Sequence, residues 1–399
     1  MSTAERPTTC PAHNFNPLTE LPVGEKIKIY DGLRDEGPIV RNEFANGYYI
    51  ITRLEEMLTV YQDSETFSNR AVSVFDPDPS YRWIPEMLDG SEHQQWRRQL
   101  GPTFSPKAVM RMEGKIRARA IELIDAFASR GSCMFMEEFA YEYPTSIFLD
   151  LMGLPYKDLK LFMEWEHGIL HLTGSGEEAS RKRGEAMAEV NKYFETVIAD
   201  RRSNPGDDLI SKAMTFEVDG KPVSDADMGA FCLLMFMAGL DTVSATLGLS
   251  FLHLAKNPED RQRIVDDPAL IPTAIEEFIR AYAIVIPARK ATKDTEIAGC
   301  PIKAGDMLAL PINAATRDEA AFEDAKSVQI DRSPNNHLGF GAGPHRCLGS
   351  HLARRELAAA IEEWHRRIPN YRLAEGVAPT ESGSQLGPGD GIKLIWDVP

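Results

Sequence analysis

Hydrophobic positions recur at helical spacing over most of this chain, and they alternate in a strand-like way over much less of it. The helical spacing predicts successive helices over residues 108–130, 136–152, 157–172, 177–203 and 350–367. Alternation predicts a hairpin over residues 39–52, around an Asn-Gly turn, and short strands between residues 290 and 310. The chain is therefore expected to be mainly α-helical with a small β-rich subregion.

The longest pattern runs from Ser224 to Lys256 and is apolar almost without interruption. Ser224 and Asp227 form an S-x-x-D capping box, which predicts a helix start at this point. A helix of ~33 residues would be ~50 Å long, enough to cross a whole domain. Because apolar residues occupy both faces, we expect both faces to be buried. Polar side chains make the segment unsuitable for a membrane span; they are Asp241, Thr242, Ser244 and Thr246.

Composition narrows the classes of protein that fit. The chain has 399 residues, of which 43% are hydrophobic and 26% charged, as in ordinary globular proteins. A formal net charge of -16 argues against binding to nucleic acid or to anionic membranes. The amino end shows no apolar run of the kind found in signal peptides, and residues 1–24 have the composition of a loosely held tail. Without internal repeats or low-complexity linkers, we expect one cytoplasmic domain over residues 1–399, present as a monomer.

The five cysteines are scattered along the chain and odd in number; they are Cys10, Cys133, Cys232, Cys300 and Cys347. Such a set is typical of reduced thiols in the cytoplasm rather than of a disulfide framework.

Cys347 stands out because it follows a glycine-rich run and precedes a helical pattern that begins at Ser350. Glycines let the backbone turn tightly and approach a flat ligand closely. The start of a helix and the neighbouring His345 and Arg346 favour a thiolate over a thiol at Cys347. The sequence therefore predicts a soft, anionic sulfur ligand.

Other interpretations of the same stretch remain. A lone cysteine is often a buried structural residue. A dinucleotide-binding fingerprint would need glycine where Arg346 stands, and no clean strand precedes the loop. A zinc site would use His337, His345, Cys347 and His351, but no second pair of ligands supports it.

As a whole string, F-G-x-G-x-H-R-C-x-G resembles the haem-binding loop of the cytochrome P450 family. The matching residues are Phe340, Gly341, Gly343, His345, Arg346, Cys347 and Gly349. The resemblance implies that Cys347 is the axial thiolate ligand of the iron in a haem b, between this loop and the long central helix. Thiolate ligation favours O–O bond cleavage.

Two further stretches resemble motifs of the same family. His93 and Arg97 lie four residues apart, which by itself fits a solvated cationic face. By resemblance they bind the two haem propionates as cationic donors, and Arg289 stands where the family has a second propionate-binding arginine. Glu277 and Arg280 lie three apart and fit a surface ion pair, whereas the resemblance implies a buried structural pair behind the haem.

Asp241 and Thr242 interrupt the apolar central segment, where polar groups are costly unless they are paired or used. One interpretation is structural, with an arginine beside Asp241 and the Thr242 hydroxyl bonded to the preceding turn. The string from Ala238 to Thr242 resembles the family's acid–alcohol motif beside the haem, with Ala238 at the cofactor. The resemblance implies that Gly239 leaves room for O₂, while Asp241 and Thr242 deliver protons. Val243 departs from the family pattern, in which Thr or Ser is frequent.

The substrate pocket is the least specified part of the sequence. Residues 67–89 lack periodicity and predict a long loop, which either buries its own aromatic side chains or forms a pocket wall. The helix–loop–helix around residues 174–176 resembles the family's mobile lid. The pocket candidates are Phe75, Trp83, Leu170, Leu234, Ile284 and Ile286.

The resemblance implies a monooxygenase that inserts one oxygen atom from O₂ into a small lipophilic molecule by hydroxylation, epoxidation or O-dealkylation. Electrons would come from NAD(P)H through a separate 2Fe–2S ferredoxin and its reductase. Two other classes stay open. A peroxide-driven haem enzyme would not need Asp241 and Thr242, and a haem-thiolate sensor or carrier would bind haem through Cys347 without turnover.

Overall fold

The computed structural model describes residues 10–171, 177–381 and 387–398. Its helices are α1 (Glu25–Glu36), α2 (Leu54–Gln62), α3 (Gly90–Phe104), α4 (Pro106–Phe127), α5 (Glu142–Met152), α6 (Leu159–Glu166), α7 (Glu177–Ser203), α8 (Leu209–Ala213), α9 (Asp225–Gly239), α10 (Asp241–Lys256), α11 (Pro258–Asp266), α12 (Ile271–Ala281), α13 (Ile312–Thr316) and α14 (Ser350–Arg367). Short 3₁₀ turns are η1 (Ala128–Arg130), η3 (Tyr156–Asp158), η5 (Pro268–Leu270) and η6 (Gly343–His345), and π-helical turns are η2 (Met136–Ala140) and η4 (His167–His171).

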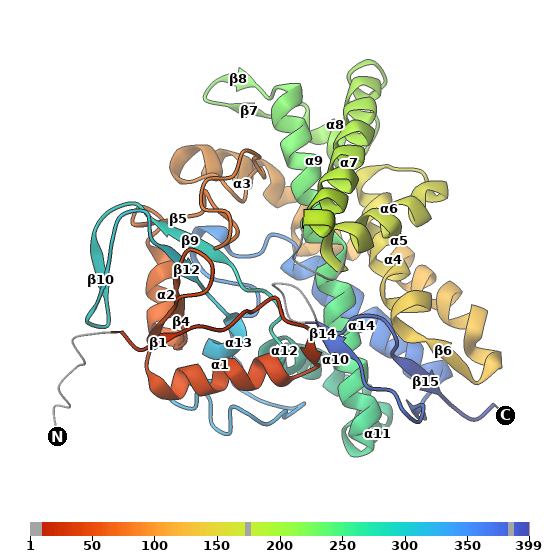
Figure 1. Cartoon of the computed structure of the whole chain (residues 1–399). Helices are drawn as coiled ribbons and strands as arrows, with labels where there is room; N and C mark the ends of the chain where they lie inside the picture. The colour runs from red at the N-terminus through yellow and green to blue at the C-terminus, as the bar shows by residue number, and fades with distance from the viewer. Residues whose placement is uncertain (1–9, 172–176, 382–386, 399) are drawn as a thin grey trace.

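The strands are short and lie mostly on one side of the molecule (Figure 1). They are β1 (Ala12–His13), β2 (Leu21–Pro22), β3 (Ile39–Asn42), β4 (Tyr48–Ile51), β5 (Phe67–Ser68), β6 (Ser132–Met134), β7 (Glu217–Val218), β8 (Lys221–Pro222), β9 (Ala288–Ala291), β10 (Thr295–Ile297), β11 (Cys300–Ile302), β12 (Met307–Ala309), β13 (Arg372–Leu373), β14 (Thr380–Glu381) and β15 (Lys393–Ile395). The largest sheet has the order β1-β3-β4-β12-β9-β5, and it contains the predicted hairpin as β3 and β4. The prediction of a mainly helical fold with a small β-rich subregion is confirmed.

The central apolar segment forms a column through the middle of the molecule (Figure 1). It begins where predicted, because the Ser224 side chain accepts a hydrogen bond from the Asp227 N–H at 3.1 Å. It differs from the single predicted helix in one respect, since Leu240 separates α9 from α10. The hydroxyls of Thr242 and Ser244 donate to the carbonyls of Ala238 and Leu240, and such bonds to the preceding turn bend helices.

Residues 225–256 are long and apolar enough to cross a membrane by length and composition alone. Inside this protein, 61% of the most apolar window is buried, and a helix at the centre of a protein core passes the same test. Helices α12 and α14 pack beside α10, and α4 packs against α14. All four helices share a core that contains Phe251, Ile275 and Trp364.

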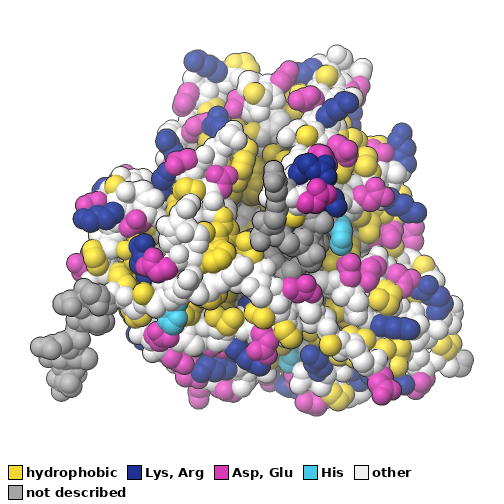
Figure 2. Space-filling model, viewed as in Figure 1, with side chains coloured by type: hydrophobic (Ala, Val, Ile, Leu, Met, Phe, Trp, Pro, Cys, Tyr) yellow, Lys and Arg dark blue, Asp and Glu magenta, His cyan; other side chains and the backbone are white. Residues whose placement is uncertain are grey.

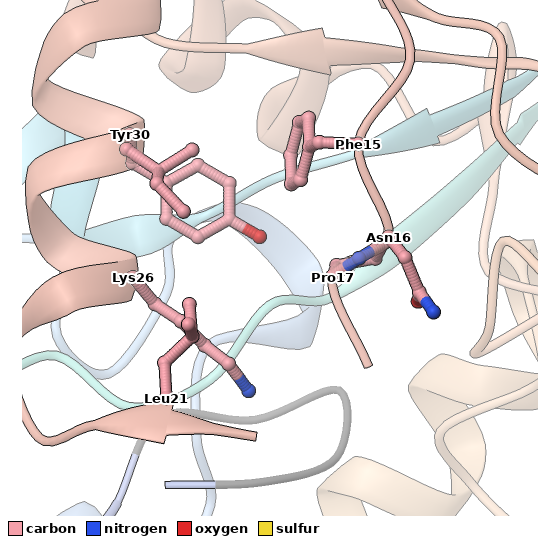
Figure 3. Close-up of a pocket in the computed structure, with 7 residues that line it drawn as sticks. Phe15, Asn16, Pro17, Leu21, Lys26 and Tyr30 are labelled. Carbon is pink, nitrogen blue, oxygen red and sulfur yellow. The ribbon is translucent and has the colours of Figure 1, made fainter. Parts of the chain in front are cut away.

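The amino-terminal segment from residue 10 to residue 24 is held more firmly than the sequence predicts. Strand β1 pairs in parallel with β3, and β2 pairs with β14 near the other end of the chain. The ring of Phe15 packs edge-on against Tyr30 of α1, beside a shallow hollow that Lys26 also lines (Figure 3). The prediction of a loosely held tail is wrong for these residues, because main-chain pairing and aromatic packing fix them. Residues 1–9 lie outside the described part.

A disulfide joins Cys10 to Cys300 at the start of β11. The prediction that all five cysteines are free thiols is therefore wrong for this pair. The error has a simple cause, since the two positions are separated by 290 residues and meet only through the fold of the β-rich side. Cys133, Cys232 and Cys347 remain free thiols.

Candidate active site

The loop before α14 folds back on itself so that Cys347 lies beside Phe340. The Cys347 N–H donates to the Phe340 carbonyl at 2.8 Å, and the Gly341 N–H donates to the Leu338 carbonyl at 2.7 Å. Gly343 has a φ of +66° and would press a Cβ into the Tyr61 carbonyl of α2, so only glycine fits there. The loop is thus built from close backbone contacts that its glycines permit.

The thiol of Cys347 is accessible to a water-sized sphere although protein atoms surround it. Burial raises the pKa of this thiol, and the lowering effects of the Gly349 N–H and of Arg97 are smaller. The prediction that local charges favour a thiolate is therefore wrong for the chain alone, because desolvation outweighs them. A metal ion bound to the sulfur would remove that proton.

Helix α12 fastens both flanks of the cysteine loop through a residue that the sequence analysis missed. Glu276 accepts a hydrogen bond from Arg354 of α14 at 2.8 Å and contacts His337, just before the loop, at 2.9 Å. The Arg354 guanidinium also lies 4.4 Å from the ring centroid of Phe340. The sequence held one indication of Glu276, because this residue directly precedes Glu277 of the predicted ion pair. Its partners lie far along the chain, so the sequence alone did not reveal the contacts.

The predicted pair His93 and Arg97 lies on one face of α3 and contacts the cysteine loop. His93 stacks on His345 with ring centroids 3.8 Å apart, and Arg97 donates to the Arg346 carbonyl. Burial, followed by the charges of His345 and Arg97, lowers the pKa of His93 to about 3. A lowered pKa favours the neutral imidazole of His93, and binding of the haem propionates by His93 and Arg97 remains a prediction. His345 itself faces Asp89, 3.7 Å from one ring nitrogen.

Arg289 of β9 is the most informative cation of the site. Its side chain is only 3% exposed, yet within the described ranges it has no carboxylate partner. Its guanidinium donates to the Ala288 carbonyl at 2.7 Å and lies 5.2 Å from the ring centroid of Tyr61. Buried charges are normally paired, so Arg289 fits a site that receives an acidic group.

The structure brings Glu277 and Arg280 together deep inside the protein. Their side chains are 0% exposed and form an ion pair of 2.7 Å. The remaining guanidinium hydrogens go to carbonyls of the irregular segment at residues 316–327. Glu277 also accepts from Arg332, Asn335 and the Gln329 N–H, partners that the sequence analysis did not anticipate.

On the central column, Ala238 and Gly239 are exposed, whereas Phe236 before them and Leu240 after them are buried. Two small, accessible residues therefore lie at the end of α9 that adjoins the break at Leu240. The side chain that Gly239 lacks would point at the Phe148 ring, 3.1 Å away. Gly239 therefore permits the close approach of Phe148 of α5, and its role in making room for O₂ remains a prediction.

Asp241 and Thr242 begin α10, directly after the break at Leu240. Asp241 is 6% exposed, and Thr242 is partly exposed with its hydroxyl 3.1 Å from the Ala238 carbonyl. The hydroxyl therefore makes the bond expected for a structural threonine, although the residue itself remains partly exposed.

The predicted pocket residues fall into two hydrophobic groups rather than one. Phe75, Ile284 and Ile286 pack with a cluster that includes residues of α10, whereas Trp83 and Leu170 pack with a cluster around α9. Leu234 is buried within α9 itself. The hollow in Figure 3 is lined by none of these six residues. Figure 2 shows hydrophobic side chains gathered in the middle of one face, with charged side chains of both signs around them.

These residues fit a haem with a thiolate ligand. An accessible sulfur, an exposed stretch of α9 and a buried arginine without a carboxylate are what a flat, acidic, iron-bearing ligand requires. The fold and the site together define a helical haem-thiolate class of protein.

Comparisons with known proteins agree. The sequence profile of the family described as Cytochrome P450 matches residues 28–268 and 265–366. A probable cytochrome P450 127A1 of Sinorhizobium fredii is 35% identical over 387 residues, which are 95% of this chain and 92% of the relative. A steroid C26-monooxygenase of Mycobacterium tuberculosis is 32% identical and covers 88% of this chain and 87% of its own length. The crystal structure of CYP101J2 superimposes with a TM-score of 0.87 at 32% identity, over 99% of this chain and 100% of that one.

The chain belongs to the cytochrome P450 family and is a P450 monooxygenase, and membership implies a haem-thiolate iron cofactor.

Proposed function

We propose that this monooxygenase places one oxygen atom from O₂ into a small lipophilic substrate, by hydroxylation, epoxidation or O-dealkylation. The observation that carries the proposal is the accessible Cys347 thiol inside the protein, together with the exposed Ala238–Gly239 stretch of a buried helix. We further propose that residues 1–399 act as one domain. Location in the cytoplasm and a monomeric state remain predictions.

The test of cofactor binding is a pair of cysteine variants. Cys347→Ala should lose the reduced, carbon monoxide-bound spectrum of a thiolate-ligated haem, because no other free thiol lies at the loop. Cys133→Ala is the matched control, since Cys133 is also a free cysteine but is buried in β6. An unchanged spectrum in Cys347→Ala would refute the assignment.

The chain's own residues would hold the cofactor, a haem b, in three ways. Cys347 would bind the iron, Arg289 and Arg97 would pair with the propionates, and His93 would donate a neutral N–H. The iron supplies the oxygen-activating chemistry when the haem is bound. Phe340, Gly341 and Gly349 would shape the loop around the sulfur, and the ion pair of Glu277 and Arg280 would fix α12 behind it.

Asp241 and Thr242 would supply protons beside the exposed stretch of α9. The Thr242 hydroxyl can hold a water molecule on its accessible side, and the Asp241 carboxyl can pass protons to it. Positioned proton transfer of this kind contributes ~10²–10⁴ in rate. The pair has no use in a peroxide-driven enzyme, and this favours activation of O₂ with external electrons.

The substrate proposal is limited to its class. The six predicted pocket residues are all apolar, and the relatives include a steroid monooxygenase and a methyl-branched lipid hydroxylase. A panel of apolar ligands would test the class, with displacement of water from ferric iron read by the Soret shift. Binding of polar ligands alone would contradict the class.

We propose that a separate 2Fe–2S ferredoxin, reduced by an NAD(P)H-dependent reductase, docks on cations beside the cysteine loop. The proposed patch consists of exposed cationic residues that form no ion pair within the described ranges; they are Arg98, Lys107, Arg111 and Arg346. Arg354 of α14, a further cation near the loop, is not part of this patch because it is paired with Glu276. Met110, 54% exposed, lies in sequence between Lys107 and Arg111 and gives the patch an apolar member.

Salt and charge reversal test this patch. Reduction by an acidic ferredoxin should slow as ionic strength rises and should slow further in Arg111→Glu. The control is Arg372→Glu, which reverses an exposed charge on β13. Equal rates in both variants would contradict docking at the patch.

A further inference from the structure

His337 lies directly before the cysteine loop, and its two ring nitrogens have different partners. The Gly339 N–H donates to Nδ1 at 3.0 Å, and Nε2 lies 2.9 Å from a carboxylate oxygen of Glu276. The imidazole is well enclosed, since its side chain is only 3% exposed. An N–H can donate only to a ring nitrogen that carries no proton, so the proton of this imidazole is on Nε2 and is donated to Glu276.

Glu276 holds the far end of this contact in place. Its two carboxylate oxygens accept from Nε and Nη2 of Arg354, the second at 2.8 Å, so the ion pair is bidentate. Arg354 also donates to the Ser350 carbonyl at 3.3 Å, within its own helix. Helices α12 and α14 thus meet through one carboxylate, and the His337 imidazole is attached to their junction.

The backbone of Gly339 lies between the imidazole and α12. A Cβ on Gly339 would come within 2.2 Å of the Ile279 side chain and 2.9 Å of the Ile279 carbonyl, so only a bare backbone fits there. Among the residues that the structure describes, the Gly339 N–H has no acceptor besides His337. Loss of Nδ1 would therefore leave a polar backbone group without its partner.

Phe340, the next residue, connects this backbone to the cysteine. Its carbonyl accepts from the Cys347 N–H at 2.8 Å. Its ring centroid lies 4.4 Å from the Arg354 guanidinium and 6.3 Å from the centroid of the His337 ring. The peptide that carries the Phe340 carbonyl thus has contacts on both sides, and its direction determines the direction of the Cys347 N–H.

These contacts distinguish His337 from the zinc ligand that the sequence left open. Both of its ring nitrogens are already engaged. In the described parts of the chain, no group of three or more His, Cys, Asp or Glu side chains is placed to hold a metal ion. The imidazole therefore acts on the loop backbone and not on a metal of its own.

We propose that His337, held by Glu276, is a positioning residue that orients Cys347 toward the iron. Nδ1 fixes the Gly339 N–H, the adjoining peptide presents the Phe340 carbonyl to the Cys347 N–H, and this bond directs the sulfur. The inference rests on the proposed function, in which Cys347 binds the iron of a haem. It adds an imidazole on α12's side of the loop to the groups that determine where the sulfur points.

Three substitutions of His337 separate its two contacts. His337→Ala removes both. His337→Asn keeps an oxygen near the position of Nδ1, where it can accept from the Gly339 N–H, but it is too short to reach Glu276. His337→Gln can reach Glu276 but places no acceptor near the position of Nδ1.

The measurement is the fraction of thiolate-ligated haem in the reduced, carbon monoxide-bound spectrum of each purified haem protein, followed through a titration with mild urea. We expect the equilibrium between thiolate-ligated and other haem to shift by about tenfold in His337→Ala and His337→Gln, as for the loss of one ordinary hydrogen bond. His337→Asn should retain the wild-type fraction. If His337→Ala yields too little protein, the Asn and Gln variants, which differ by one methylene, carry the test alone.

His253→Ala is the matched control, with the melting temperature recorded for every variant. His253 is also enclosed, and its two ring nitrogens also have partners, the Tyr282 hydroxyl at 2.8 Å and the Asp260 carboxylate at 3.0 Å, but it lies on α10. His253→Ala should lower the melting temperature without changing the fraction of thiolate-ligated haem.

Two results would overturn the role of His337 and leave the proposed function intact. A wild-type fraction of thiolate-ligated haem in His337→Gln would show that Nδ1 does not position the loop. A fraction in His337→Asn as low as in His337→Gln would refute the acceptor role in the same way. A wild-type protein without the thiolate spectrum would instead refute the proposed function.

Discussion

Two buried polar clusters lie in this molecule, and they are built on opposite plans. The Glu277 cluster (Glu277, Arg280 and Arg332) places carboxylate against guanidinium, with ion pairs of 2.7 and 3.0 Å. The Asp241 cluster (Asp241, Tyr141 and Glu166) has two buried carboxyl groups whose charges, together with burial, raise the pKa of the Tyr141 phenol. In the first cluster opposite charges neutralise each other, so the side chains gain no stabilisation by moving. The second cluster consists of acids and a phenol, which are groups that take up and release protons.

The two clusters show that buried polar groups can serve two purposes. Removing charges from water is expensive, and a pair repays this only with good geometry and further hydrogen bonds. The Glu277 cluster meets that condition through carbonyls and side chains of the irregular segment before the cysteine loop. It therefore fixes α12 and the loop, whereas the Asp241 cluster is suited to chemistry.

The largest expected effect comes from breaking the Glu277 cluster. Glu277→Ala leaves Arg280 buried without its carboxylate, which typically costs ~3–5 kcal/mol. We expect little folded haem protein and a strongly lowered melting temperature, measured by thermal unfolding of whatever is recovered. Glu25→Ala, which removes an exposed pair with Lys28, should change stability by less than ~1 kcal/mol. Equal melting temperatures for the two variants would mean that the buried pair does not stabilise the fold.

A smaller effect on the fold, but a large one on turnover, is expected from the Asp241 cluster and its neighbour. Asp241→Asn should slow oxygen consumption, and Thr242→Ala should release hydrogen peroxide in place of product, each within ~10²–10⁴ in rate or coupling. Product formed per NADH oxidised, measured with peroxide released, checks both.

Ser244→Ala is the matched control for Thr242→Ala. Ser244 makes the same bond to the preceding turn, at 3.0 Å to the Leu240 carbonyl, but it is fully buried. If Ser244→Ala uncouples turnover as strongly as Thr242→Ala, the hydroxyls serve the bend of the helix and not proton delivery.

The smallest effect concerns acid stability at Glu276, next to the Glu277 cluster. Burial opposes ionisation, but hydrogen bonds from Arg354 and His337 lower the pKa of Glu276 from 4.5 to about 2. A lowered folded pKa gives stabilisation that is complete above the unfolded value and is lost as the pH falls from 4.5 toward 2. The difference in melting temperature between wild type and Glu276→Gln should therefore be largest near neutral pH and shrink at about pH 3.

The exposed Glu296 offers the comparison for that experiment. Glu296→Gln should show no such pH-dependent difference. A constant difference for Glu276→Gln across the same range would show that its charge contributes nothing.

Local patterns in the sequence predicted the helices well, because helical periodicity records which face of a segment is buried. The capping box at Ser224 and the hairpin at β3 and β4 were read correctly for the same reason. The break at Leu240 was missed, since it depends on how two hydroxyls compete for carbonyls within the folded helix.

Contacts between distant segments could not be predicted from the sequence. The cysteine loop was visible as a motif, but the fastening of Glu276 to Arg354 and the disulfide between Cys10 and Cys300 are products of tertiary folding. The pocket candidates show the same limit. All six are apolar, but apolar character did not reveal that five of them separate into groups around α9 and α10.

Segments near the two ends of the chain pair with each other. Strand β2 pairs with β14, and the Glu381 carboxylate accepts from the N–H groups of Gly24 and Lys26, each at 3.2 Å, at the start of α1. Thr380 of β14 in turn accepts from the Gly389 N–H at 2.8 Å, within residues 387–391, a segment that lies against Gly248 of the central column. A tag, fusion or proteolytic cut near residue 24 should therefore weaken the packing of residues 387–391 on the central column, although no sequence motif marks this position.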